Sequence, residues 1–302
     1  GAALVGLVER FFLKDERQLN APACTLDGVY CWLLGLLAHL SLALLLLMLG
    51  ATWWLATVAP LLLAAFAGKQ LLLIIQQWAI NVRNTVFKRW DFIAWIVFHL
   101  FLGSSLFHVD EAIRTPWMNN YGDLTFHLGM IAHFVTSNDF PPLYHAFAGE
   151  LLSYPFFVNL WAAMLWWPFD GFASLSSVFM LQWCLVWAAL YWLLSKNKAY
   201  VFPFLLLFGG GSYLSIFLHN SVFSWQLIYK GYPWTTWLST IWVTQRSAML
   251  GALVGVAVGR LLVNAIKQEN AKLKAIIAGA LLAMTPLVHT PFFMVTALFW
   301  GM

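Results

Sequence analysis

The sequence predicts an all-α, polytopic membrane protein with about seven transmembrane helices and with juxtamembrane or re-entrant helices in its first large outer loop. Three observations predict this class. Apolar residues make up 62% of the 302 positions and charged residues only 9%, whereas soluble domains carry about 25% charged residues. The apolar residues fall in runs near the ~20 residues that cross a bilayer. The basic residues are sorted toward one side of those runs.

The first 90 residues are predicted to form an N-terminal segment with two spans. The first span covers about 31–50 and stops at the sequence Gly50-Ala51-Thr52, and the second covers about 53–78. Lys69 lies inside the second span, where its long side chain can reach the lipid headgroups. Residues 1–90 are therefore treated as one predicted domain.

Residues 91–302 are predicted to form a second, larger membrane module. Its first span, about 90–107, leads into a long polar loop, and four more spans are predicted at 173–195, 199–217, 245–265 and 275–299. The chain starts at Gly1 and stops inside an apolar run at Met302. We therefore expect this module to be truncated at its C-terminus, within a longer protein.

Segment 151–168 is predicted to dip into the membrane and return rather than to cross it. It is short and is bounded by Pro155 and by the turn Pro168-Phe169-Asp170-Gly171. With this assignment, twelve Lys and Arg residues lie on the inner side and only Arg114, Lys230 and Arg246 lie outside. A crossing segment divides the basic residues far more evenly. The net charge of +4 thus reflects membrane orientation, and no nucleic-acid partner is predicted.

The loop from His108 to Glu150 gathers the ionisable groups of an otherwise apolar chain. It holds five of the twelve acidic residues and four of the eight histidines. Ionisable groups in membrane proteins are costly and usually mark a functional site. We therefore expect binding or chemistry on the outer face.

Asp110 and Glu111 follow the point where a predicted span leaves the membrane. Partial desolvation at that boundary makes a carboxylate a better general base. One acid of an adjacent pair could act as the base while the other holds a partner. A polar helix stop at the headgroup level is the alternative interpretation.

Asp123 and His127 are four residues apart on a helix predicted over 123–136. One face of that helix could present both to a divalent metal ion or to a phosphate. Asp123 could equally cap the N-terminus of the helix. The passage 138–145 contains two adjacent prolines, which predicts a defined extended connector, and His145 at its end is a candidate for substrate binding.

Arg246 is predicted to open a span on the outer face. Its planar guanidinium suits a phosphate, and a helix start favours anions; an arginine that reaches the lipid headgroups is the alternative. Lys230, in an aromatic outer loop, and His289, between Pro286 and Pro291, are further candidates. His289 could instead satisfy backbone carbonyls that the two prolines free.

Several short blocks carry a family resemblance, in the order GDLTFHLGMIAHF, NDFPPLYHAFAGELLSYPF, TTWLSTIWVTQRSAMLG and LLAMTPLVHTPFF. With the acidic pair that follows a span, they resemble the GT-C class of polytopic glycosyltransferases. Within it they are similar to a bacterial branch related to the protein O-mannosyltransferase and aminoarabinose transferase families. The resemblance covers about 91–302. The two spans before residue 80 depart from the simplest family plan, in which the acidic loop follows the first span.

The resemblance implies an enzyme that moves a sugar from a polyprenyl-phosphate donor to a glycan, lipid or protein acceptor, with inversion at the anomeric carbon. It implies that Asp110 deprotonates the acceptor, that Glu111 assists, and that Arg246, Lys230 and His289 hold the lipid phosphate. It implies a site on the periplasmic or extracellular face of a bacterial inner membrane.

For Asp123 and His127 the resemblance implies acceptor binding or coordination of a divalent metal, and no other cofactor is implied. Two other functions stay open. One is a transporter or flippase of a lipid-linked saccharide, and the other is a non-catalytic subunit of polysaccharide assembly.

Overall fold

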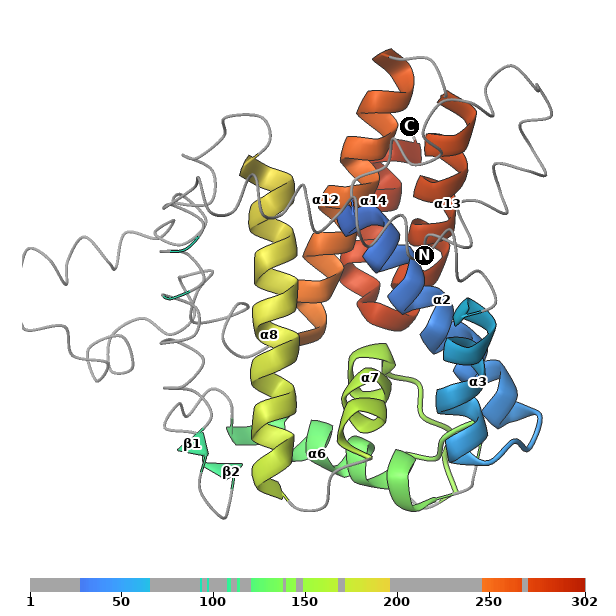
Figure 1. Cartoon of the computed structure of the whole chain (residues 1–302), viewed down its shortest axis with the longest axis vertical. Helices are drawn as coiled ribbons and strands as arrows, with labels where there is room; N and C mark the ends of the chain where they lie inside the picture. The colour runs from blue at the N-terminus through green and yellow to red at the C-terminus, as the bar shows by residue number, and fades with distance from the viewer. Residues whose placement is uncertain are drawn as a thin grey trace, which may run out of the picture. The chain divides into compact units, whose positions relative to one another are not determined.

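A computed structural model describes residues 28–65, 93, 97, 108–109, 113–114, 121–137, 140–144, 149–167, 172–195, 246–267 and 271–301 (Figure 1). These residues are helical apart from a pair of two-residue strands, an isolated bridge and short connections. The chain divides into two compact units. Unit 1 contains Gly1–Ile93, Thr136–Phe157 and Val254–Met302, and unit 2 contains Ala94–Val135 and Val158–Leu253.

Four of the described helices are long and apolar enough to cross a membrane, which supports a helical membrane protein. They are α2 (Gly28–Met48), α8 (Phe172–Ser195), α12 (Arg246–Lys267) and α13 (Ala271–Val288). The first three agree with the spans predicted at 31–50, 173–195 and 245–265. The predicted total of about seven spans is not confirmed. The predicted span 199–217 and the predicted domain boundary near residue 90 lie outside the described residues. Nearly all of the predicted span 90–107 lies outside them as well.

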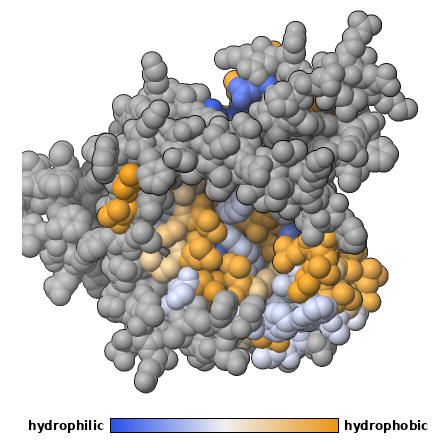
Figure 2. All heavy atoms as spheres, in the orientation of Figure 1, coloured by the Kyte–Doolittle hydropathy of each residue, from blue (hydrophilic) through white to orange (hydrophobic). Residues whose placement is uncertain are grey.

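In unit 1, α2 packs against α13 and against α3 (Trp53–Ala65). The buried residues of α2 recur every three or four positions, as one face of a helix requires: Tyr30, Cys31, Leu33, Leu34, Leu37, Leu40, Ala43 and Leu47. On α3, Leu61 and Leu62 are both more than half exposed. Figure 2 shows apolar atoms on the surface that α3 forms, as expected for a face in contact with lipid.

The predicted break at Gly50 is present in the structure. Gly50 has a φ of +82°, the left-handed conformation that ends many helices. The Ala51 N–H donates to Leu46 O at 2.9 Å and closes the end of α2. Thr52 then begins α3, because its Oγ1 accepts the N–H of Leu55 at 3.4 Å. The turn thus follows directly from the local sequence.

The predicted span 275–299 consists of two helices, α13 and α14 (Thr290–Gly301), which meet at His289. Pro291 accounts for the break, because it has no N–H for the carbonyl of Leu287 and its ring crowds that carbonyl. His289 Nδ1 accepts the N–H of Phe292 at 3.3 Å and caps α14. The sequence left open that His289 bonds to a backbone carbonyl freed by the prolines. In the described structure its imidazole instead accepts a hydrogen bond from a backbone N–H.

The connector after α6 is extended and paired with itself. The Tyr144 N–H donates to Glu150 O at 2.7 Å, and the Leu152 N–H donates to Pro142 O at 2.9 Å. Gly149, with a φ of +87°, supplies the left-handed residue of the return. The connector is therefore a defined element, as its prolines predicted, although His145 lies outside the described residues.

Unit 2 contains α6 (Tyr121–Thr136), nearly all of α7 (Phe157–Trp166), α8 and the first two turns of α12. Strands β1 (His108–Val109) and β2 (Ile113–Arg114) pair antiparallel and lie against α8. Helix α7 is only about 15 Å long at 1.5 Å per residue, which is too short to cross a bilayer. Its length supports the prediction that segment 151–168 does not cross the membrane.

Candidate functional site

Arg246 is the first residue of α12, as the sequence predicted. Its guanidinium is partly buried in unit 2 and makes two described hydrogen bonds to side-chain amides. Nη1 donates to Gln182 Oε1 at 3.2 Å, and Nη2 donates to Asn159 Oδ1 at 3.1 Å. The two bonds fix the plane of the guanidinium relative to α7 and α8.

The face of the guanidinium lies over an aromatic ring. The Arg246 Cζ atom is 3.8 Å from the centre of the Phe179 ring, well inside the ~6 Å range of a cation–π contact. These contacts orient a cation at a helix start, where the helix dipole adds further positive potential.

Gln182 and Asn159 are buried polar residues inside apolar helices. Gln182 is 3% exposed and Asn159 is 1% exposed. Gln182 Nε2 also donates to Val158 O at 3.2 Å, and Asn159 Nδ2 lies 3.5 Å from Met130 Sδ. Because an unsatisfied buried amide costs about 1–3 kcal/mol, these bonds stabilise the arrangement as well as orienting Arg246.

His127 is joined to the same network. Its side chain is 6% exposed, and its Nδ1 lies 3.0 Å from Asn159 Nδ2. Asn159 therefore bridges Arg246 of α12 and His127 of α6. We name these four residues the polar network: His127, Asn159, Gln182 and Arg246.

Ser176 lies one turn before Phe179 and shares its face of α8 with Phe179 and Gln182. Its side chain is 0% exposed, and its Oγ has no hydrogen-bond partner among the described residues. A buried hydroxyl without a partner is unusual, because its desolvation is not offset. This face of α8 thus carries a polar atom that a bound ligand could satisfy.

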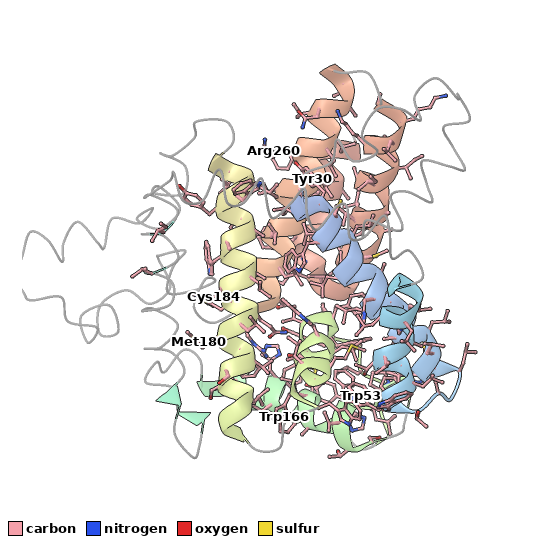
Figure 3. The ribbon with its side chains drawn as sticks, viewed as in Figure 1. Tyr30, Trp53, Trp166, Met180, Cys184 and Arg260 are labelled. Carbon is pink, nitrogen blue, oxygen red and sulfur yellow. The ribbon has the colours of Figure 1, made fainter. Side chains whose placement is uncertain are left out.

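Asp110 and Glu111 lie outside the described residues, whereas the two short strands on either side of them are described. Asp110 and Glu111 fall in the sequence between β1 and β2, whose register pairs His108 with Arg114 and Val109 with Ile113. Figure 1 shows this strand pair beside the lower end of α8. Met180 lies below Cys184 in Figure 3, so the lower end is where α8 begins.

The other predicted site residues are not brought together by the described structure. Asp123 lies in the first turn of α6, two residues after the helix begins, rather than at the capping position. His289 belongs to unit 1 and caps α14. Lys230 and His145 lie outside the described residues. Among the described residues, no cluster of three His, Cys, Asp or Glu side chains could hold a metal ion.

The sequence reasoning missed three residues of the site: Asn159, Gln182 and Phe179. A signal for the two amides was present, because each is a polar residue within an apolar run, FFVNLWAAM and FMLQWCLVW. Polar residues inside membrane segments usually face the interior of the bundle. Phe179 gave no such signal, since the chain has 25 phenylalanines.

Comparison of the chain with protein-family models, with curated proteins and with solved structures found no match.

Proposed function

We propose that the protein is a membrane glycosyltransferase that moves a sugar from a polyprenyl-phosphate donor to an acceptor at the outer membrane face. The observation that carries the proposal is Arg246, a cation oriented by two buried amides and a ring at the start of a membrane-length helix. Such a group at the lipid boundary suits a phosphate whose tail stays in the bilayer. The donor, the acceptor and the bacterial inner-membrane location are parts of the proposal.

The start of α12 supports phosphate binding by a second route. The backbone N–H groups of its first turn carry a partial positive charge, equivalent to roughly half an elementary charge for a full helix. Arg246 adds a full charge at the same point. The hydroxyl of Ser176, which has no hydrogen-bond partner among the described residues, lies on the face of α8 that Arg246 contacts and offers a neutral donor. Lys230, which lies outside the described residues, is proposed to assist.

The acidic pair supplies the other half of the proposed reaction. Asp110 removes the proton from the acceptor hydroxyl or amine, and Glu111 assists. The acceptor atom then forms a bond to the anomeric carbon while the bond from that carbon to the phosphate oxygen breaks, with inversion. Arg246 stabilises the negative charge that the departing polyprenyl phosphate gains. Strands β1 and β2 flank the acids and lie against α8, which also carries Phe179 and Gln182.

The binding half is tested with polyprenyl phosphate and with the polyprenyl alcohol of the same chain length, added to protein in lipid nanodiscs. The wild type should bind the phosphate at least tenfold more tightly than the alcohol, since a charge-assisted hydrogen bond contributes about 1.5–3 kcal/mol. Arg246→Gln should remove this preference. Arg260→Gln removes a second arginine of α12 and should keep it. Equal affinities for the two lipids in the wild type contradict the proposal.

The transfer half is tested with Asp110→Asn and polyprenyl-phosphate hexoses as donors. The variant should lose transfer while keeping the preference for polyprenyl phosphate over the alcohol. If Asp110→Asn transfers the sugar at the wild-type rate, Asp110 has no role in the reaction. That result would not contradict the proposed binding of the lipid phosphate by Arg246.

A flippase of a lipid-linked saccharide is the second candidate, and the broken helix α13–α14 favours it. Discontinuous helices hold substrates in many transporters. The two functions separate in liposomes that contain a fluorescent polyprenyl-phosphate sugar. A flippase moves this lipid between leaflets, whereas a transferase consumes its sugar in one leaflet.

A further inference from the structure

We infer that Asn159 is a positioning residue that holds His127 as the tautomer protonated at Nε2, so that His127 serves the site as a hydrogen-bond donor. The direction of each hydrogen bond in the polar network determines this tautomer. The sequence left the role of His127 open between coordination of a metal ion and binding of a phosphate or an acceptor.

Arg246 sets the direction of the hydrogen bonds in the network, because a guanidinium can only donate. The atom of Asn159 that lies 3.1 Å from Arg246 Nη2 must therefore be the amide oxygen, Oδ1. This fixes the orientation of the Asn159 amide, whose shape alone does not distinguish it from its flipped form. The amide nitrogen Nδ2 then faces the opposite partner.

That opposite partner is His127 Nδ1, at 3.0 Å. Since Asn159 Nδ2 carries only donors, His127 Nδ1 must accept, and it cannot carry a proton in this arrangement. A neutral imidazole then has its proton on Nε2. The Nε2 atom of His127 thus carries the proton and has no lone pair for a metal ion.

Gln182 is oriented by Arg246 in the same way. Its Oε1 faces Arg246 Nη1, which only donates, and its Nε2 faces Val158 O, which only accepts. Both ends of this amide demand the same orientation. Each buried amide of the network therefore presents its oxygen to Arg246, and the donors point away from the guanidinium.

These directions also describe the chemistry of the network. Arg246 and the Nε2 atom of His127 carry donors and no acceptor, which matches partners with oxygen acceptors, such as a phosphate or a sugar hydroxyl. The assignment of the tautomer stands without the proposed transfer reaction, because it rests only on the hydrogen bonds. Its use toward a lipid phosphate rests on the proposed function.

The test is ¹⁵N NMR of protein labelled at its eight histidines, with His127→Gln used to identify the His127 signals. In the wild type, His127 should show a protonated Nε2 and an unprotonated Nδ1. Asn159→Asp should reverse the tautomer, because a carboxylate can accept from both Arg246 and His127 and thereby favours a proton on Nδ1. Asn264→Asp makes the same chemical change near the other end of α12 and should leave the His127 signals unchanged.

A proton on Nδ1 in the wild type, or an equal mixture of tautomers, overturns the inference. So does a wild-type His127 Nε2 signal that shifts when zinc chloride is added. The wild-type spectrum decides the tautomer even if Asn159→Asp fails to fold. Loss of lipid-phosphate binding with the Nε2 proton present would refute the proposed function and leave the positioning role of Asn159 intact.

Discussion

Gln182 connects three helices of the site through one side-chain amide. Its oxygen accepts from Arg246 and its nitrogen donates to Val158 O, so one amide joins α12 to α7 through α8. The side chain is 3% exposed, and water therefore cannot replace either bond readily. The residue serves both stability and the orientation of Arg246.

Gln182→Leu should lower the free energy of unfolding by about 1–2 kcal/mol. Hydrogen bonds between membrane helices average only about 0.6 kcal/mol, but this change leaves a charged donor and a buried carbonyl without their partner. Unfolding in mixed micelles with a denaturing detergent measures the loss. Leu181→Ala, at a neighbouring position that is 48% exposed, should change stability by less than about 0.5 kcal/mol. Equal effects of the two changes would mean that the amide contributes nothing specific.

At the scale of helices, α12 and α14 approach each other closely at Gly255. A Cβ atom at this position would lie 3.1 Å from Thr296 Oγ1, and the Thr296 side chain is itself only 6% exposed. Gly279 on α13 has the opposite setting, because a Cβ atom there would meet no atom within 4 Å. Small residues let membrane helices approach closely, and only the first of these glycines is used in that way.

We therefore expect Gly255→Leu to destabilise the protein by about 1–3 kcal/mol, the usual cost of overpacking. Gly279→Leu should be neutral or stabilising, because leucine has a helix propensity about 0.8 kcal/mol better than that of glycine. Thermal unfolding of the two variants in the same detergent provides the comparison. If both variants unfold at the wild-type temperature, the contact between α12 and α14 at Gly255 is not tight in solution.

At the scale of the whole chain, the sidedness of the membrane segments can be tested with two exposed residues, Glu150 and Lys272. Glu150→Cys should react with a membrane-impermeant maleimide in intact cells, and Lys272→Cys should react only after permeabilisation. The parent is a variant in which the three native cysteines are serine. Labelling of both positions from outside would mean that segment 151–168 crosses the membrane.

Much of the fold could be predicted because long apolar runs identify spans without reference to their partners. The spans predicted at 31–50, 173–195 and 245–265 coincide with described helices that are long and apolar enough to cross a membrane. The helix predicted over 123–136 coincides with α6. The break at His289 was missed, because an apolar run that contains prolines can be kinked or divided and the sequence does not decide between them.

The candidate site could be predicted only at Arg246 and His127, whose charge or ring chemistry is evident in the sequence. Asn159 and Gln182 owe their roles to the way in which α6, α7, α8 and α12 face one another, and a single sequence does not specify these rotations. Asp110 and Glu111 stay predictions. The site thus combines residues that can be recognised in the sequence by their side-chain chemistry with residues that can be recognised only from the packing of the helices.

The joint at His289 has a consequence for how this part of the chain matches the thickness of a bilayer. An unbroken helix over 271–301 would be about 45 Å long at 1.5 Å per residue, whereas the hydrocarbon layer is about 30 Å thick. Such a helix would have to tilt steeply or deform the lipid. Ending α13 at Val288 leaves a helix of about 27 Å, which nearly matches the layer without strain in the surrounding lipid. The capped joint therefore removes a hydrophobic mismatch that the apolar sequence would otherwise impose.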